Sequence, residues 1–166
     1  MENVHLRVLS WDQFHQKVFA LAKKVQDSDF EPEVIAGIGF GGIIPATTMY
    51  FAVPEVKFRI LYPDKYGNLE LENIKELEGK RVLLVDDLVI SGDSLSATRK
   101  KVLEGGATDI RTACIYCTPG YEELDFCHRM LEPDERIVFP WYTCPDDKGV
   151  KVFKYVGRFG KYEPNI

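Results

Sequence analysis

The most restrictive feature of the sequence is a central run of apolar residues that shows no alternation with polar ones. Arg81-Val-Leu-Leu-Val85 comes shortly after Gly79 and leads directly into two acidic residues. A strand that is apolar at every position is covered on both faces, which is typical of the middle of a parallel sheet. The run therefore predicts a central parallel strand.

Helices and strands are expected to alternate around that strand. Ser10 opens the first helix, because Gln13 stands three residues later in a capping-box pattern. Further strands are expected at 34–38, 56–61 and 110–116, and further helices at 43–52 and 93–104. This alternation implies right-handed crossovers and an α/β fold, an open and mostly parallel sheet flanked by helices.

Length and charge narrow the class of protein. A chain of 166 residues suits one domain over 1–166, and a net charge of -5 argues against a nucleic-acid partner. No apolar run approaches the roughly 20 residues of a membrane span, and the N-terminus lacks a signal-peptide core. We therefore expect a cytoplasmic protein with neither a membrane nor a nucleic-acid partner.

The four cysteines raise the question of a zinc site. Cys114 and Cys117 have metal-type spacing, but they lie inside a predicted strand. No second close pair follows, only Cys127 and Cys144 singly. We expect reduced thiols packed as small apolar groups rather than zinc ligands.

Two strand-to-helix loops carry unusual residues, and the first is Asp86-Asp-Leu-Val-Ile-Ser-Gly-Asp-Ser94. Adjacent carboxylates at a buried strand end suit ribose hydroxyls or Mg²⁺, and the free amides of the following helix suit a phosphate. Together they match a ribose 5-phosphate. The structural alternative makes Asp93 a helix N-cap and leaves Asp86 and Asp87 at a solvated strand end.

The second loop is Gly37-Ile-Gly-Phe-Gly-Gly42. Its glycines allow close approach of backbone amides to a phosphate. The spacing also satisfies the dinucleotide fingerprint G-x-G-x-x-G, so a nicotinamide-dependent oxidoreductase is an alternative. That alternative offers no account of the acidic loop.

The stretch from Val82 to Ser94 resembles the phosphoribosyl-pyrophosphate (PRPP) motif of type I phosphoribosyltransferases. The resemblance implies that Asp86 and Asp87 hold the ribose hydroxyls and the associated Mg²⁺. It implies that the loop after them binds the 5′-phosphate through Ser91, Gly92, Asp93 and Ser94. The pyrophosphate loop would comprise Gly39, Phe40, Gly41 and Gly42.

The resemblance extends over nearly the whole chain and is nearest to the xanthine-guanine and hypoxanthine branch. It implies a small C-terminal hood over roughly 121–166, in which Ile137 offers backbone groups to a purine. Trp141 would pack in the hood or in ordinary core. Lys65 and Tyr66 are candidates for a lid over pyrophosphate, or simply for a solvated turn.

Four positions depart from the family pattern. Phe40 stands where Arg or Lys is usual, and Ile90 where a carboxylate is common. Thr118 takes the place of the lysine that addresses the purine oxo group. Arg136 lies near the place of the aromatic that stacks on the base, and its planar guanidinium is able to stack as well.

These observations favour a purine phosphoribosyltransferase of nucleotide salvage, acting on PRPP and a 6-oxopurine with Mg²⁺. A PRPP- or nucleotide-binding regulatory module without turnover is the alternative, because each departure removes charge or base recognition. A homo-oligomer is possible on family resemblance.

Overall fold

The computed structural model describes residues 5–64, 74–121, 124–146 and 149–152. By its internal contacts the chain divides into two compact units. The larger unit is Gln16–Pro133, and the smaller unit joins Met1–His15 to Asp134–Ile166. The expectation of a single domain with a hood over roughly 121–166 stays a prediction.

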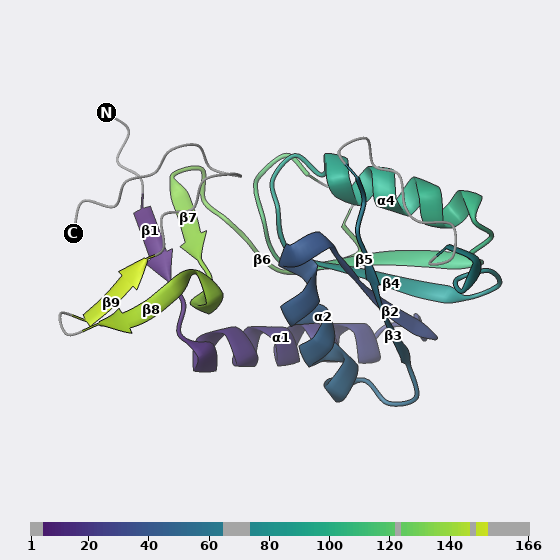
Figure 1. Cartoon of the computed structure of the whole chain (residues 1–166), viewed down its shortest axis with the longest axis horizontal. Coiled ribbons are helices and arrows are strands. Elements are labelled where there is room, and N and C mark those ends of the chain that lie inside the picture. The colour runs from purple at the N-terminus through teal and green to yellow at the C-terminus, as the bar shows by residue number, and fades with distance from the viewer. Residues whose placement is uncertain (1–4, 65–73, 122–123, 147–148, 153–166) are drawn as a thin grey trace. The chain divides into compact units, whose positions relative to one another are not determined.

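A five-stranded parallel sheet forms the centre of the larger unit (Figure 1). Its strands are β2 (Val34–Ile38), β3 (Lys57–Leu61), β4 (Arg81–Val89), β5 (Asp109–Cys117) and β6 (Phe126–Met130). Their order is β3-β2-β4-β5-β6. The predicted α/β fold with an open parallel sheet is confirmed.

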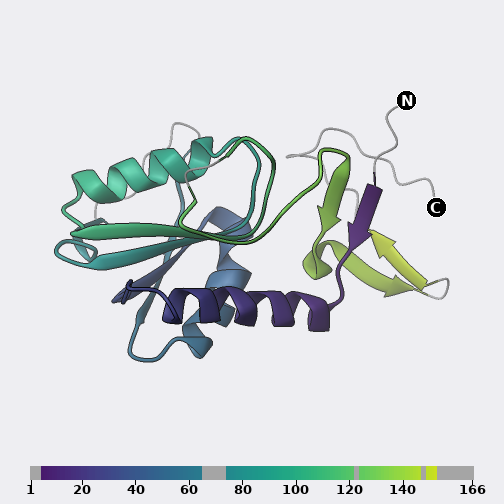
Figure 2. The same ribbon diagram turned by 180° about the vertical axis from the view of Figure 1, so that it is seen from behind.

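Helices cover both faces of this sheet. They are α1 (Trp11–Gln26), α2 (Gly39–Ala52) and α4 (Asp93–Glu104). The two views place α4 over one face and α2, with the later turns of α1, over the other (Figures 1 and 2). Among the described residues, no helix has the length and apolar character needed to cross a bilayer.

The start of α1 follows its sequence signals. The Ser10 amide donates to Gln13 Oε1 at 3.0 Å, and the Gln13 amide donates to Ser10 Oγ at 3.1 Å, which is the predicted capping box. The helix then buries one face of apolar side chains, comprising Phe14, Val18, Leu21, Ala22 and Val25.

The central strand β4 is buried on both faces, as its apolar run predicts. Val82 and Leu84 belong to a cluster that includes Leu95 of α4, whereas Leu83 and Val85, of opposite parity, are also fully buried. Each fully buried aliphatic side chain contributes about 1.5–3 kcal/mol to folding. The sheet therefore holds its loops on a rigid base.

Two predicted boundaries were wrong by more than one residue, and both lie at the loops of interest. Helix α2 begins at Gly39 rather than at residue 43. The earlier start was missed because its N-cap, Ile38, makes no side-chain hydrogen bond and so gives no signal in the sequence. Pro45, expected in the first turn, lies further inside the helix. Strand β4 continues to Val89, because its last residues pair with β5 as far as Cys117.

The smaller unit contains two short pairs of strands. Strand β1 (His5–Val8) pairs in parallel with β7 (Glu135–Val138), and β8 (Thr143–Asp146) pairs antiparallel with β9 (Gly149–Val152). A 3₁₀ turn, η1 (Pro140–Tyr142), connects β7 to β8.

An aromatic cluster packs beside these strands in the smaller unit. The rings of Phe139 and Trp141 stack with centroids 4.6 Å apart, and Phe14 meets Trp141 edge-on at 5.1 Å. Offset or edge-on aromatic pairs of this kind stabilise a core beyond their buried area. Trp141 therefore packs against neighbouring aromatic rings, and both of its expected roles involve such packing.

Candidate functional site

The topology of the larger unit singles out one edge of the sheet. Strands β2 and β4 are neighbours, while β3 continues the sheet on one side and β5 on the other. The chain reverses its direction of progress at this point, and ligands of open α/β sheets bind outside the carboxyl ends of such strands. The two loops singled out by sequence follow β2 and β4 and therefore share this edge.

Gly41 and the acidic pair show how close these loops lie. A Cβ built on Gly41 would overlap Asp87 Oδ1 and would lie 2.9 Å from Asp86 Oδ1. Only a residue without a side chain leaves the carboxylates in place, so glycine is required here by space rather than by φ. Two segments 45 residues apart thus meet at the switch point.

Asp86 and Asp87 are each only 3% exposed, so they are not a solvated strand end. The Asp87 amide donates to Asp86 Oδ1 at 2.9 Å, and the Leu88 amide donates to Asp87 Oδ1 at 2.7 Å. Hydrogen bonds from amides stabilise buried carboxylates. A pair of hard carboxylate oxygen donors at a strand end fits a magnesium ion, which prefers such ligands.

The loop after β4 ends in a left-handed residue that turns the chain into α4. Gly92 is the N-cap at φ 76°, where glycine is favoured, so the interpretation of Asp93 as N-cap is wrong. The Ser91 hydroxyl donates to Asp93 Oδ2 at 2.7 Å.

The first turn of α4 presents amides toward this loop. The Asp93 amide approaches only Ser91 Oγ, at 3.5 Å, and within the described ranges the amides of Ser94 and Leu95 donate to no residue. Unsatisfied amides and the positive end of the helix dipole favour an anion. Asp93, Ser94 and Leu95 therefore retain donors for a phosphate group.

Tyr121 is a neighbour of this loop that sequence reasoning missed. Its ring lies where a side chain on Gly92 would have to go, and its hydroxyl is 3.2 Å from Ser96 Oγ. An isolated tyrosine after a strand carries no local signal of such a contact. The segment that follows the carboxyl end of β5 thus contacts the loop between β4 and α4.

Two of the departing positions meet beside the same loop. Thr118 Oγ1 donates to the Ile90 carbonyl at 2.7 Å, and the Thr118 amide donates to the Val89 carbonyl at 2.9 Å. Phe40 is 82% exposed, and its ring meets Tyr62 edge-on at 5.2 Å. At the three positions where the resemblance implies charged side chains, this chain therefore carries neutral ones, namely Phe40, Ile90 and Thr118.

The remaining predicted residues lie outside this group. In the smaller unit, Arg136 Nη1 donates to the Glu135 carbonyl at 2.8 Å, and Ile137 is buried in β7. Arg136, Ile137 and Trp141 stay predicted base-binding residues. Lys65 and Tyr66 fall outside the described residues.

Comparison with known families decides what kind of protein carries this site. The model of the phosphoribosyl transferase domain family matches residues 7–148. The chain belongs to that family. Its nearest branch is that of the 6-oxopurine enzymes, and the match favours the phosphoribosyltransferase interpretation over a dinucleotide-binding one.

Individual relatives support this assignment. Xanthine-guanine phosphoribosyltransferase of Desulfotalea psychrophila is 28% identical over 145 residues, which cover 81% of this chain and 85% of that protein. The structure of a purine phosphoribosyltransferase from Pyrococcus horikoshii matches with a TM-score of 0.71 at 28% identity, covering 85% of this chain and 94% of that one.

A third relative is a regulator. Transcriptional regulator GfcR of Methanococcoides burtonii is 32% identical over 100 residues, or 56% of this chain. The chain spans about half the length of that regulator, since the match covers 49% of it.

Proposed function

We propose that this protein transfers the 5-phosphoribosyl group of PRPP to a ring nitrogen of a 6-oxopurine and releases pyrophosphate. The observation that carries the proposal is the position of Gly41 against the buried carboxylates of Asp86 and Asp87, beside the first turn of α4. Carboxylates that meet a glycine loop, in the same segment as the free amides of a helix start, suit a sugar that carries phosphoryl groups. Its role would be nucleotide salvage in the cytoplasm.

Each part of the site has a role in this reaction. Asp86 and Asp87 accept hydrogen bonds from the ribose hydroxyls, and the loop from Ser91 to Ser94 holds the 5′-phosphate with amides and hydroxyls. The backbone from Gly39 to Gly42 approaches the pyrophosphate, which glycine permits. Positioning of the sugar between these anchors lowers the barrier without a covalent intermediate.

Magnesium fits the same site. Asp86 and Asp87 are the residues that would hold it, together with substrate oxygens, because both offer carboxylates at the strand end. When bound, Mg²⁺ supplies positive charge to the departing pyrophosphate. That contribution matters here because Phe40 provides no charge of its own.

The purine side of the proposal uses the base-binding residues that the family resemblance implies. Ile137 would offer backbone groups to the base, Arg136 would stack on it, and Trp141 would support that surface. Thr118, held by Ile90, would face the oxo group as a neutral donor or acceptor. Lys65 and Tyr66 would close over pyrophosphate.

A second candidate is a regulatory module that binds PRPP without turning it over. The exposed ring of Phe40 favours this function, since a missing cation weakens stabilisation of the leaving group. Ile90 favours it as well, because its side chain has no proton to exchange with a base. The similarity to a transcriptional regulator is consistent with such a module.

Release of pyrophosphate from Mg-PRPP, measured with guanine, xanthine, hypoxanthine, adenine and orotate in turn, separates the two candidates. Base-dependent release with one or more oxopurines supports the transferase. Thermal stabilisation by PRPP without release for any base supports the module. Absence of both release and stabilisation contradicts the proposed site.

A further inference from the structure

Three cysteine sulfurs lie close together on β5 and β6, the last two strands in the order of the larger unit's sheet. Cys114 and Cys117 belong to β5, and Cys127 belongs to β6. Cys127 Sγ lies 3.7 Å from Cys114 Sγ and 3.3 Å from Cys117 Sγ, and all three sulfurs lie within 4.8 Å of one another. From the sequence, Cys127 was expected to stand singly, so its position beside Cys114 and Cys117 was not predicted.

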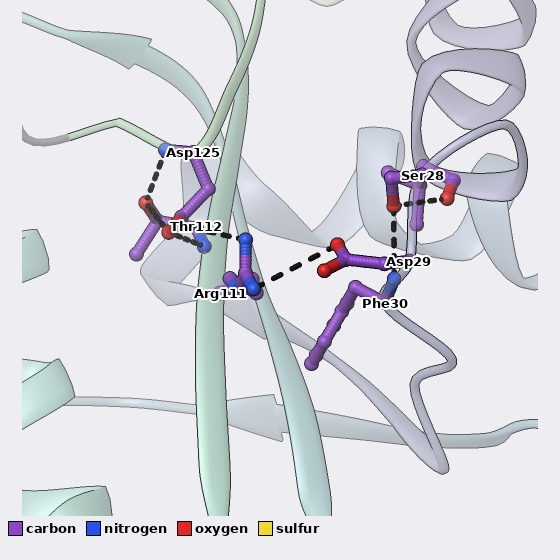
Figure 3. A network of polar contacts seen from close by, with 7 residues as sticks. Ser28, Asp29, Phe30, Arg111, Thr112 and Asp125 are labelled. Carbon is purple, nitrogen blue, oxygen red and sulfur yellow. Dashed lines mark hydrogen bonds and ion pairs between the residues drawn. The ribbon is translucent and has the colours of Figure 1, made fainter.

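Strand register brings Cys127 into place. Cys114 and Cys127 are direct partners in the parallel ladder between β5 and β6. Just before β6, the Thr112 amide and hydroxyl donate to Asp125 Oδ2 at 2.8 and 3.0 Å. The Asp125 amide donates back to Thr112 Oγ1 at 3.2 Å (Figure 3). This reciprocal clamp aligns the two strands two residues before the cysteines.

An ionic contact strengthens the same clamp. Arg111 lies between Asp29 and Asp125, with nitrogen–oxygen distances of 3.8 and 3.7 Å (Figure 3). Its guanidinium also lies over the Phe30 ring, 5.5 Å from the centroid. Asp125, just before β6, is therefore bound by both Thr112 and Arg111. These contacts fix the register of β5 and β6, and the register sets the spacing of the sulfurs.

The surroundings of the three sulfurs are apolar. Cys114 and Cys117 are buried within the cluster that contains Val89 and Leu95, and the less buried Cys127 packs against it. Burial raises the pKa of the Cys114 thiol. Hydrogen bonds from Cys114 and then Cys127 outweigh desolvation at Cys117 and lower the pKa of that thiol to about 6.

We propose that Cys114, Cys117 and Cys127 bind one soft, thiophilic metal ion of the Zn²⁺ or Cu⁺ class. An ion 2.3 Å from each of its ligands in tetrahedral geometry separates two sulfurs by about 3.8 Å, close to the spacing observed. Thiolates select this class of metal over the hard Mg²⁺ expected at the acidic pair. The site is separate from the proposed phosphoribosyl chemistry and stands without it.

The donor set also limits the coordination. Among the residues that the structure describes, no histidine, aspartate or glutamate joins the three sulfurs. The described residues therefore supply three ligands, and a fourth coordination position is left for another donor. Cys114 pairs with Asp86 and Cys117 with Val89 across the sheet, so the ion would stabilise the base of the acidic loop.

Metal titration of the reduced full-length protein without oxygen tests the site. Co²⁺, as a probe for Zn²⁺, should produce sulfur-to-cobalt charge-transfer bands at one ion per chain, and Zn²⁺ should displace it. Competition with a chromophoric Cu⁺ chelator identifies Cu⁺ as the ion if copper binds more tightly. At a hundredfold excess over Kd, either ion should raise Tm by about 5–10 °C.

Two matched variants define the ligands. Cys127→Ser changes the least buried of the three, and it should keep the far-ultraviolet circular dichroism of the parent while losing the charge-transfer bands. Cys144→Ser alters the cysteine of the smaller unit, and its bands should be unchanged.

Four results overturn the proposal. Parent protein that binds neither Co²⁺, Zn²⁺ nor Cu⁺ contradicts it, and so do bands that survive Cys127→Ser or disappear with Cys144→Ser. A metal-free protein whose mass shows the loss of two hydrogens between Cys117 and Cys127 would identify a disulfide pair instead.

Discussion

The two strand ends that meet at the switch point present different recognition groups. The end of β4 supplies buried carboxylates, a serine hydroxyl and the amides that start α4. The end of β2 passes at once into α2, whose first residues are three glycines and an exposed phenylalanine. Under the proposed function, the end of β4 would recognise the ligand with side chains and the end of β2 with backbone groups. Substitutions that remove side-chain atoms should therefore weaken ligand binding at the end of β4. Substitutions that add side-chain atoms should weaken it at the end of β2.

The largest effect is expected at the end of β4. Asp87→Ala removes a buried carboxylate from the proposed ribose and magnesium site. We expect the PRPP-dependent stabilisation, about 2.7 kcal/mol at a hundredfold excess over Kd, to disappear. Pyrophosphate release should fall by about 10²–10³-fold, the usual cost of one electrostatic contact to the transition state.

Thermal unfolding with and without Mg-PRPP measures the effect of Asp87→Ala. The melting temperature of the free variant serves as the control for folding. A PRPP-induced shift equal to that of the parent would show that the acidic pair does not hold the sugar.

The converse change belongs at the end of β2. Gly41→Ala places a methyl group against the Asp87 carboxylate, so the loops must separate. We expect a loss of about 1–3 kcal/mol in the free energy of unfolding, as for other overpacked sites. PRPP affinity should fall about tenfold or more, measured by calorimetric titration.

Gly39→Ala is the matched control for this change. A Cβ on Gly39 meets no atom within 4 Å, although φ is +55° and the substitution costs about 1–2 kcal/mol of backbone strain. Its PRPP affinity should fall less than that of Gly41→Ala, because its methyl group does not displace the Asp87 carboxylate. Equal losses of affinity in both glycine variants would show that backbone freedom, and not space, governs this end.

Phe40→Arg tests whether the end of β2 faces pyrophosphate. The Phe40 side chain is 82% exposed, so an arginine fits without repacking. A charge-assisted contact to the leaving group should raise kcat/KM for pyrophosphate release about tenfold, which corresponds to ~1.4 kcal/mol. The gain should shrink at high salt, where exposed charges are screened. An unchanged rate together with unchanged pyrophosphate inhibition would place the leaving group elsewhere.

The smallest effect is expected from Ser91→Ala. This change removes the hydroxyl that donates to Asp93 and that would donate to the 5′-phosphate instead when PRPP is bound. The loss of one hydrogen bond costs about 0.5–1.5 kcal/mol, so PRPP affinity should fall roughly fivefold. Titration calorimetry of the variant beside Asp87→Ala ranks the two contacts. A larger loss for Ser91→Ala would reverse the proposed order of importance at this strand end.

Local signals account for most of the secondary structure that could be predicted. Strand 34–38 and helix 93–104 were predicted with the observed bounds, and Gly105 is the C-cap of that helix. The start of α2 was missed because glycines and an isoleucine cap contain no start signal. The end of β4 was missed because acidic residues disfavour strands locally, while pairing with β5 outweighs that preference.

Patterns along the chain were sufficient to predict the fold class and to select the two loops that are proposed to carry the chemistry. An apolar run without alternation requires cover on both faces, and a loop of acids, hydroxyls and glycine before a helix suits a sugar phosphate. These properties depend on neighbours along the chain, so a single sequence reveals them.

Contacts between residues far apart in the chain are known only from the folded structure. It placed Gly41 against Asp87, Tyr121 against Gly92, and Cys127 beside Cys114. Each contact depends on the order and register of strands that lie tens of residues apart. A shift of one residue in register would turn every side chain of a strand to the other face, and no local pattern in this chain specifies that choice.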